Sequence, residues 1–230
     1  MLIANSYTEI CRILLKGFRE RYPHKSSILT GIVFARPELD LVQKEIIPNI
    51  DYWFRRSDYY TDFFFGGYAK GTLDGIPDFR KVTLVNRTKW YFNDKYYLDF
   101  VDEIERLSKW TPSGGTDLIL TNARCDGGKT KAYLDLSSAM SLDLEKAKSE
   151  ELFQTVPHFF ERIFHFARTV NESRLIDPVS DLSDAIGVRL AKNSLREAMI
   201  AWLPESIRKQ FRSAFTAVVS DISKPADASS

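Results

Sequence analysis

The chain has 230 residues, a length typical of one enlarged domain or of one domain with a small appendage. Hydrophobic residues make up 44% of the sequence and charged residues 27%, a composition that excludes a wholly disordered chain. Basic and acidic residues number 32 and 31, so the sequence lacks the basic excess of a broad nucleic-acid-binding face, and no nucleic acid partner is expected.

The N-terminal part of the chain predicts a helix, a buried strand and a second helix. Apolar residues recur at helical spacing over 10–20, and Pro23 stops this pattern. The apolar, β-branched run at 27–35 is too continuous for a half-exposed strand and predicts a buried central one. An inward-facing apolar stripe over 37–53 predicts the second helix, which Pro48 is expected to kink or split.

The middle of the chain predicts two more strands and a third helix. Residues 61–68 form a second buried run that ends in glycines, which allow a bend. An edge strand is predicted at 81–85. The apolar pattern over 94–107 predicts a helix that begins at a cap on Asn93 or Asp94.

A hairpin and a further helix follow. Residues 116–123 form a third apolar strand, the Asp-Gly-Gly turn at 126–128 reverses the chain, and 131–144 return beside it. A helix led by Pro157 then carries an apolar face toward the core.

This order of elements predicts an α/β fold with a mixed β-sheet flanked by helices. It resembles the thioredoxin-like order of strand, helix, strand, helix, hairpin and helix, and Pro112 precedes the third strand. The resemblance is one of element order only. The position where such a fold would carry its redox cysteines reads Ala35-Arg36-Pro37-Glu38, so there is no CxxC and no thiol–disulfide chemistry is implied.

The sequence also predicts how the chain is divided. Residues 1–176 are expected to form the α/β core domain. Residues 177–223 are expected to form a helical appendage packed on that core, with apolar stripes on both sides of Pro204, the second running to Val219. Residues 224–230 are expected to be a disordered tail.

Cysteine usage and hydropathy predict a soluble, cytoplasmic protein. Cys11 and Cys125 lie far apart in no metal or disulfide pattern, so they are expected to be reduced and without a catalytic role. The N-terminus lacks a secretory signal pattern, and no window approaches the roughly 18 uninterrupted apolar residues of a membrane span. Neither a disulfide nor a membrane partner is expected.

Aromatic density is the most unusual feature of the sequence. Residues 52–68 hold nine aromatic residues among seventeen, and 90–100 hold six more. Arginine and aspartate residues lie among them and supply guanidinium groups for a carboxylate or phosphate and rings for stacking. Burial of the rings with paired or solvated arginines is the competing interpretation. The candidate binding residues are Tyr52, Trp53, Arg55, Arg56, Asp62 and Tyr68.

Two functions follow from these candidates. The first is a non-catalytic intracellular interaction module whose aromatic and arginine surface binds another protein or a second copy of the chain. The alternative is an enzyme or sensor that binds a small phosphate-bearing ligand, such as a nucleotide, through the same residues. The interaction module is favoured, so an enzyme is not the first expectation, and no catalytic residue and no cofactor are predicted.

Two other motifs resemble functional sites but lack part of the required pattern. The segment 123–130 ends in Gly-Lys-Thr like a phosphate-binding loop, but the residues after it alternate like a strand instead of opening a helix. His158, Glu161 and His165 share one helix face, but the arginines between them would repel a cation, which favours a solvated face. No metal site is therefore predicted.

Overall fold

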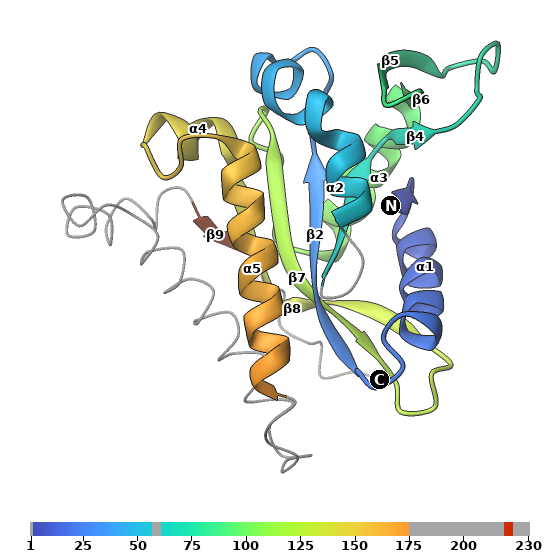
Figure 1. The fold of residues 1–230 in the computed structure, drawn as a ribbon, viewed down its shortest axis with the longest axis vertical. Helices are drawn as coiled ribbons and strands as arrows, with labels where there is room; N and C mark the ends of the chain where they lie inside the picture. The colour runs from blue at the N-terminus through green and yellow to red at the C-terminus, as the bar shows by residue number, and fades with distance from the viewer. Residues whose placement is uncertain (1, 57–60, 175–218, 223–230) are drawn as a thin grey trace.

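The computed structural model describes residues 2–56, 61–174 and 219–222, which form an α/β fold with two β-sheets (Figure 1). The large sheet is mixed, as the sequence predicted, and has six strands; the small one is antiparallel and has three. In spatial order the strands of the large sheet are β1 (Leu2–Ala4), β3 (Thr61–Gly66), β2 (Ser27–Phe34), β7 (Asp117–Cys125), β8 (Ala132–Asp143) and β9 (Val219–Asp221).

The centre of the large sheet combines both pairing directions. Strand β2 pairs in parallel with β3 on one side and antiparallel with β7 on the other. All six residues of β3 are buried, as are most of β2. Burial on both faces explains why these strands read as continuous apolar runs rather than as alternating ones. The prediction of a buried central strand at 27–35 is confirmed.

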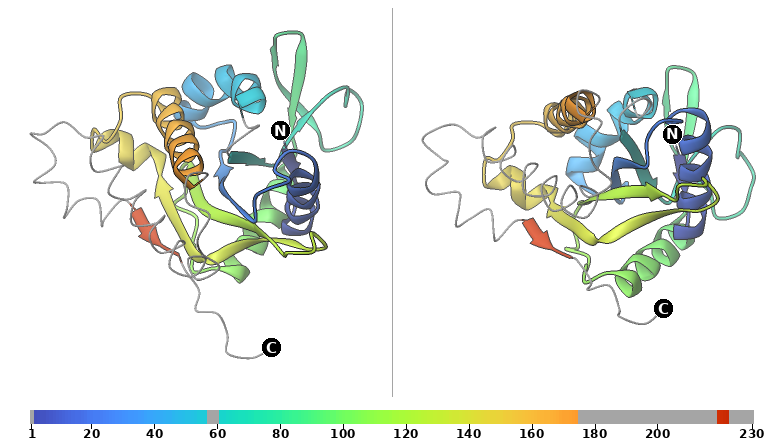
Figure 2. Two further views of the ribbon diagram at one scale, coloured as in Figure 1. Left: turned by 60° about the horizontal axis from the view of Figure 1, so that its bottom comes forward. Right: turned by 90° about the horizontal axis from the view of Figure 1, so that it is seen from below.

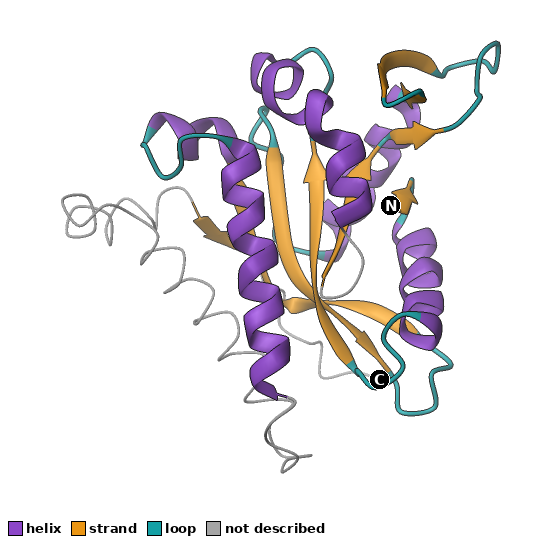
Figure 3. Ribbon diagram, viewed as in Figure 1, coloured by secondary structure: helices purple, strands orange, loops and turns teal. Residues whose placement is uncertain are grey.

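Helices cover both faces of this sheet (Figures 2 and 3). On one face, Trp53 of α2 (Ile50–Arg56) stacks on Phe65 of β3, and Phe160 of α5 (Val156–Arg174) contacts Phe63. On the other face, Phe34 of β2 packs against α3 (Asp94–Leu107). Helix α1 (Tyr7–Glu20) contacts α3. A short helix, α4 (Leu144–Ser149), follows β8 and precedes α5.

Pro48 divides the second predicted helix, as expected. Residues Val42–Ile46 form a π-helical turn and Ile47–Asn49 a 3-10 turn before α2 begins. Proline has no N–H to donate to the preceding turn, so the α-helical ladder cannot run through it. The π-helical turn is tied to α4 and α5, because the Glu45 carboxylate accepts hydrogen bonds from the Lys148 ammonium of α4 and, at 2.7 Å, from the backbone N–H of Val156 in α5.

The small sheet follows β3 after a sharp bend at Gly67. Its spatial order is β4 (Tyr68–Lys70), β6 (Thr88–Phe92) and β5 (Arg80–Val85). Gly67 has φ +78, and a Cβ there would lie 2.7 Å from Cβ of Tyr97, so both conformation and space require glycine. Strand β5 confirms the edge strand predicted at 81–85. Asn86 and Arg87 join it to β6 with φ of 50 and 63, the left-handed pair of a type I′ turn.

Strands β7 and β8 form the predicted hairpin. In its turn, the Asp126 carboxylate accepts hydrogen bonds from the backbone N–H groups of Thr130 (2.7 Å) and Lys131 (2.8 Å). The Lys129 ammonium donates to the carbonyls of Phe18 (3.0 Å) and Pro23, at the C-terminal end of α1. The lysine of the Gly-Lys-Thr segment therefore holds the hairpin to α1.

The C-terminal part of the chain differs from the prediction where it is described. The prediction that Val219 belongs to a helix is wrong. Val219–Asp221 forms β9, which pairs antiparallel with Met140–Leu142 of β8. The free edge of β8 offers backbone donors and acceptors that this segment satisfies. The rest of the predicted appendage and the tail, residues 177–218 and 223–230, lies outside the described residues.

Within the described ranges, none of the helices combines the length and the apolar character that crossing a bilayer requires. Cys11 and Cys125 are free thiols and form no disulfide, as predicted.

Candidate functional site

The six candidate binding residues lie in three different environments. Tyr52, Arg55 and Arg56 have exposed side chains on α2, with 48%, 63% and 45% of their surface accessible. Trp53, Asp62 and Tyr68 are fully buried. The six residues therefore do not form one surface.

The exposed residues of α2 are held by α5 and by the core. The Tyr52 hydroxyl donates a 2.8 Å hydrogen bond to Oε1 of Glu161 on α5. The Arg56 guanidinium lies 3.6 Å from the other carboxylate oxygen of Glu161 and 5.8 Å from the centre of the Phe164 ring. Because Glu161 serves both residues, it fixes the tyrosine and the arginine relative to each other. We call Tyr52, Arg55, Arg56 and Glu161 the α2–α5 face.

Arg55 is anchored to a buried carboxylate. Its guanidinium lies 3.0 Å from Asp51, which has no exposed surface. Asp51 also contacts the Lys70 ammonium at 3.2 Å and the Asn86 side-chain amide at 3.5 Å. Burial alone would raise the pKa of Asp51, but hydrogen bonds from Lys70 and Asn86 and the charge of Arg55 outweigh it and lower that pKa. Asp51 thus joins α2 to β4 and to the β5–β6 turn.

The buried aromatic candidates belong to the core. The Trp53 ring stacks on Phe65 with centroids 6.0 Å apart and contacts Phe160 at 4.7 Å. The Tyr68 hydroxyl donates a 2.8 Å hydrogen bond to the carbonyl of Ala35, the residue that follows β2. This part of the predicted surface agrees with the competing interpretation, in which the rings fill the core.

Asp62 forms a buried ion pair on the opposite side of the sheet from Trp53. Its carboxylate accepts two hydrogen bonds from the Arg21 guanidinium, at 2.8 and 2.9 Å, and one from the Tyr22 hydroxyl at 3.3 Å. Burial raises the pKa of Asp62, although Arg21 and Tyr22 oppose this shift. This bidentate ion pair joins β3 to the end of α1.

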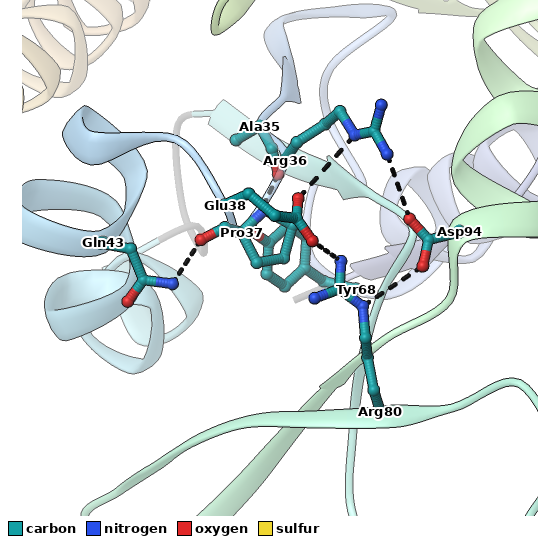
Figure 4. Close-up of polar contacts among 8 residues, drawn as sticks. All are labelled: Ala35, Arg36, Pro37, Glu38, Gln43, Tyr68, Arg80 and Asp94. Carbon is teal, nitrogen blue, oxygen red and sulfur yellow. Dashed lines mark hydrogen bonds and ion pairs between the residues drawn. The ribbon is translucent and has the colours of Figure 1, made fainter.

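A polar cluster that the sequence analysis did not identify lies where β2 ends (Figure 4). Two arginines and two carboxylates alternate around it. Arg36 lies 3.9 Å from Glu38 and 3.4 Å from Asp94, and Arg80 lies 3.2 Å from Asp94 and also pairs with Glu38. We call Arg36, Glu38, Arg80 and Asp94 the arginine–carboxylate ring.

Aromatic and titratable groups surround this ring. The Arg36 guanidinium lies 5.9 Å from the centre of the Tyr97 ring, and Arg80 lies 5.0 Å from that of Phe92. Burial, with the charge of Asp117, raises the pKa of Tyr97 to about 12. Asp117 faces Phe34 across the β2–β7 ladder, and burial, with the charges of Asp143 and Glu145, raises its pKa to about 6 although Ser113 donates hydrogen bonds to it.

On α5, Glu161 and His158 contact tyrosine and arginine side chains. Glu161 is occupied by Tyr52 and Arg56, and Arg162 donates to His158 at 3.3 Å. Among the described residues, no group of three or more histidine, cysteine, aspartate or glutamate side chains could hold a metal ion.

Comparison with known proteins gives no family for this chain. No protein-family model and no curated protein matches the sequence, and no solved structure matches the fold.

Proposed function

We propose that the protein is a non-catalytic interaction module that binds another protein, or a second copy of itself, through the α2–α5 face. The observation that carries this proposal is the state of Tyr52. Nearly half of its surface is exposed, yet its hydroxyl is bonded to Glu161, so the ring is both accessible and fixed.

A fixed, exposed aromatic ring suits a binding surface for an energetic reason. Association costs free energy when side chains lose rotational freedom, and a residue that is already held loses less. Tyrosine and arginine are also the residue types in which binding energy is concentrated. The α2–α5 face combines one such tyrosine with two arginines that are held by Asp51 and Glu161.

The arginines of the face suit a partner that carries acidic groups. The guanidinium groups of Arg55 and Arg56 remain partly exposed beside their carboxylate partners. A partner carboxylate could share either of these guanidinium groups, because their planar fork has five donors.

The proposal is tested by affinity capture from the native cell, followed by binding measurements on the recovered partner, with sedimentation equilibrium for self-association. We expect Tyr52→Ala, Arg55→Ala and Arg56→Ala each to weaken binding by roughly thirtyfold, the loss typical of a central interface residue. Arg→Lys variants at these positions should recover only part of the affinity, because lysine keeps the charge but loses the planar fork.

Matched controls lie elsewhere on the molecule. Tyr133→Ala removes an exposed tyrosine of β8, and Arg12→Ala removes an exposed arginine of α1. Both should leave binding unchanged, and circular dichroism should show that all variants fold. The proposal is wrong if the α2–α5 variants bind like these controls, or if the protein stays monomeric and captures nothing specifically.

The alternative proposal, a small phosphate-bearing ligand bound by Arg55 and Arg56, receives less support from the geometry. The two guanidinium groups are held by different carboxylates, Asp51 and Glu161, and a ligand between them would have to displace both. The same arginine variants, titrated with nucleotides, test this alternative.

We also propose that the core is thioredoxin-like and that the protein acts in the cytoplasm. The support for the first is the order β2, α2, β3, α3, β7–β8 hairpin and α5, with the small sheet inserted between β3 and α3. The support for the second is that Cys11 and Cys125 are free thiols, as is usual in a reducing compartment.

A further inference from the structure

The arginine–carboxylate ring lies at a point of the sheet that favours ligand binding. After β2 the chain passes to α2 on one face of the sheet, and after β3 it passes to α3 on the other face (Figure 2). In open α/β sheets, ligands bind outside the carboxyl ends of the strands where successive connections diverge in this way. The ring residues Arg36 and Glu38 directly follow the carboxyl end of β2.

The ring is open to solvent but fixed in place. All four side chains are about half exposed, between 42% and 53%. The guanidinium groups of Arg36 and Arg80 lie against the Tyr97 and Phe92 rings, which limits their movement.

The backbone that carries Arg36 and Glu38 is also held. The buried Tyr68 hydroxyl donates to the carbonyl of Ala35, and the Gln43 side-chain amide donates to the carbonyl of Pro37 (Figure 4). The loop backbone therefore holds Arg36 in a fixed position beside Arg80.

The two carboxylates of the ring differ in how firmly they belong to it. Asp94 is in the first turn of α3, where the helix dipole favours a negative charge, and its side chain is short. Glu38 is on the loop after β2, has a longer side chain and bridges both guanidinium groups. Exposed ion pairs contribute little stability, so exchanging the Glu38 carboxylate for another anion costs little.

We propose that Arg36 and Arg80 together bind the phosphate group of a small ligand, which takes the position of the Glu38 carboxylate. A phosphate group carries up to two negative charges and three acceptor oxygens, so it can accept hydrogen bonds from both guanidinium groups at once. Glu38 is then an internal competitor that occupies the site when no ligand is present. This site does not depend on the α2–α5 face.

The experiment is a titration with inorganic phosphate at pH 7.5 and constant ionic strength, followed by heteronuclear NMR and calorimetry. We expect saturable binding, with shifts at the backbone amides around Arg36, Arg80 and Asp94. Glu38→Gln removes the competitor and should tighten binding by about threefold or more, whereas Arg36→Ala and Arg80→Ala should weaken it by about tenfold or more.

The control for charge alone is Glu20→Gln, which removes an exposed carboxylate that pairs with Lys16 on α1. It should change phosphate affinity by less than about 1.5-fold, since distant surface charges are screened. Arg80→Lys keeps the charge and serves if the alanine variant folds poorly; it should bind between wild type and Arg80→Ala. The proposal is overturned if phosphate does not saturate, if Glu38→Gln behaves like Glu20→Gln, or if the arginine variants bind as tightly as wild type.

Discussion

Replacing Arg21 with alanine should be among the most destabilising single changes outside the hydrophobic core. Arg21 gives two hydrogen bonds to the carboxylate of Asp62, which has no exposed surface. Removing one partner of a buried pair leaves an uncompensated charge and costs about 3–5 kcal/mol. That is a large share of a typical unfolding free energy of about 5–15 kcal/mol. At roughly 2–4 °C per kcal/mol for a chain of this size, the melting temperature should fall by about 6–20 °C.

The pH dependence of this loss identifies its cause. Burial raises the pKa of Asp62 in the folded protein, and Arg21 opposes that shift, so its removal should raise the pKa further. An acid whose folded pKa lies above its unfolded value destabilises the fold as pH rises through the folded pKa. The variant should therefore recover stability, relative to wild type, as pH falls through the raised pKa of Asp62 toward the ordinary range of a carboxyl group.

Urea denaturation of Arg21→Ala, Asp62→Asn and the double variant at several pH values measures these effects. Without the carboxylate, loss of Arg21 should matter little, so the double variant should regain more than half of the lost stability. The reasoning is refuted if Arg21→Ala costs less than about 1 kcal/mol, or if the double variant is as unstable as the single one at every pH.

Two further predictions concern Asp117 and Gly17. Burial holds the pKa of Asp117 at about 6, which is above the ordinary value of a carboxyl group. Asp117→Asn should therefore stabilise the fold at pH 8 by up to about 3 kcal/mol, and this gain should vanish near pH 4. A difference in urea midpoints that does not change with pH would contradict this prediction. Gly17→Ala places a Cβ about 2.7 Å from Nη2 of Arg21. The usual gain in folding stability of about 1 kcal/mol for glycine to alanine in a helix should therefore be absent in the wild-type background and present in the Arg21→Ala background. Equal effects of Gly17→Ala in both backgrounds would show that the contact does not matter.

The elements predicted correctly are those that local physics specifies. The run at 61–66 is continuous because β3 is buried on both faces, and Pro48 breaks the helical ladder wherever it lies. The Asn93 side chain accepts from the Tyr96 backbone N–H at 2.9 Å, a cap that is legible in sequence.

Two elements that the sequence does not predict, β1 and β9, depend on partners far away in the sequence. Strands β1 and β9 have three residues each and exist because β3 and β8 offer edges to pair with. No pattern within three residues can signal such a strand. For the same reason Val219 was assigned to a helix.

The arginine–carboxylate ring could not have been found from local sequence. Its members come from the loop after β2, from β5 and from α3, and only the folded chain brings them together. In contrast, the predicted binding surface near Tyr52 rests on composition, which does not distinguish inward from outward positions. Trp53 fits the inward stripe of its helix, and the structure follows that stripe rather than the surface assignment.

The aromatic density itself has a structural explanation that sharpens the proposed function. Among the described residues of 52–68, five rings are fully buried, because β3 presents rings to helices on both faces and Tyr68 continues into the small sheet beyond Gly67. These five residues are Trp53, Phe63, Phe64, Phe65 and Tyr68. Packing at this density leaves the adjoining turn of α2 little freedom to move. Tyr52 is thus an exposed ring on a rigid helix. A partner that binds it would lose little free energy to the ordering of this surface, because the core already holds the helix in place.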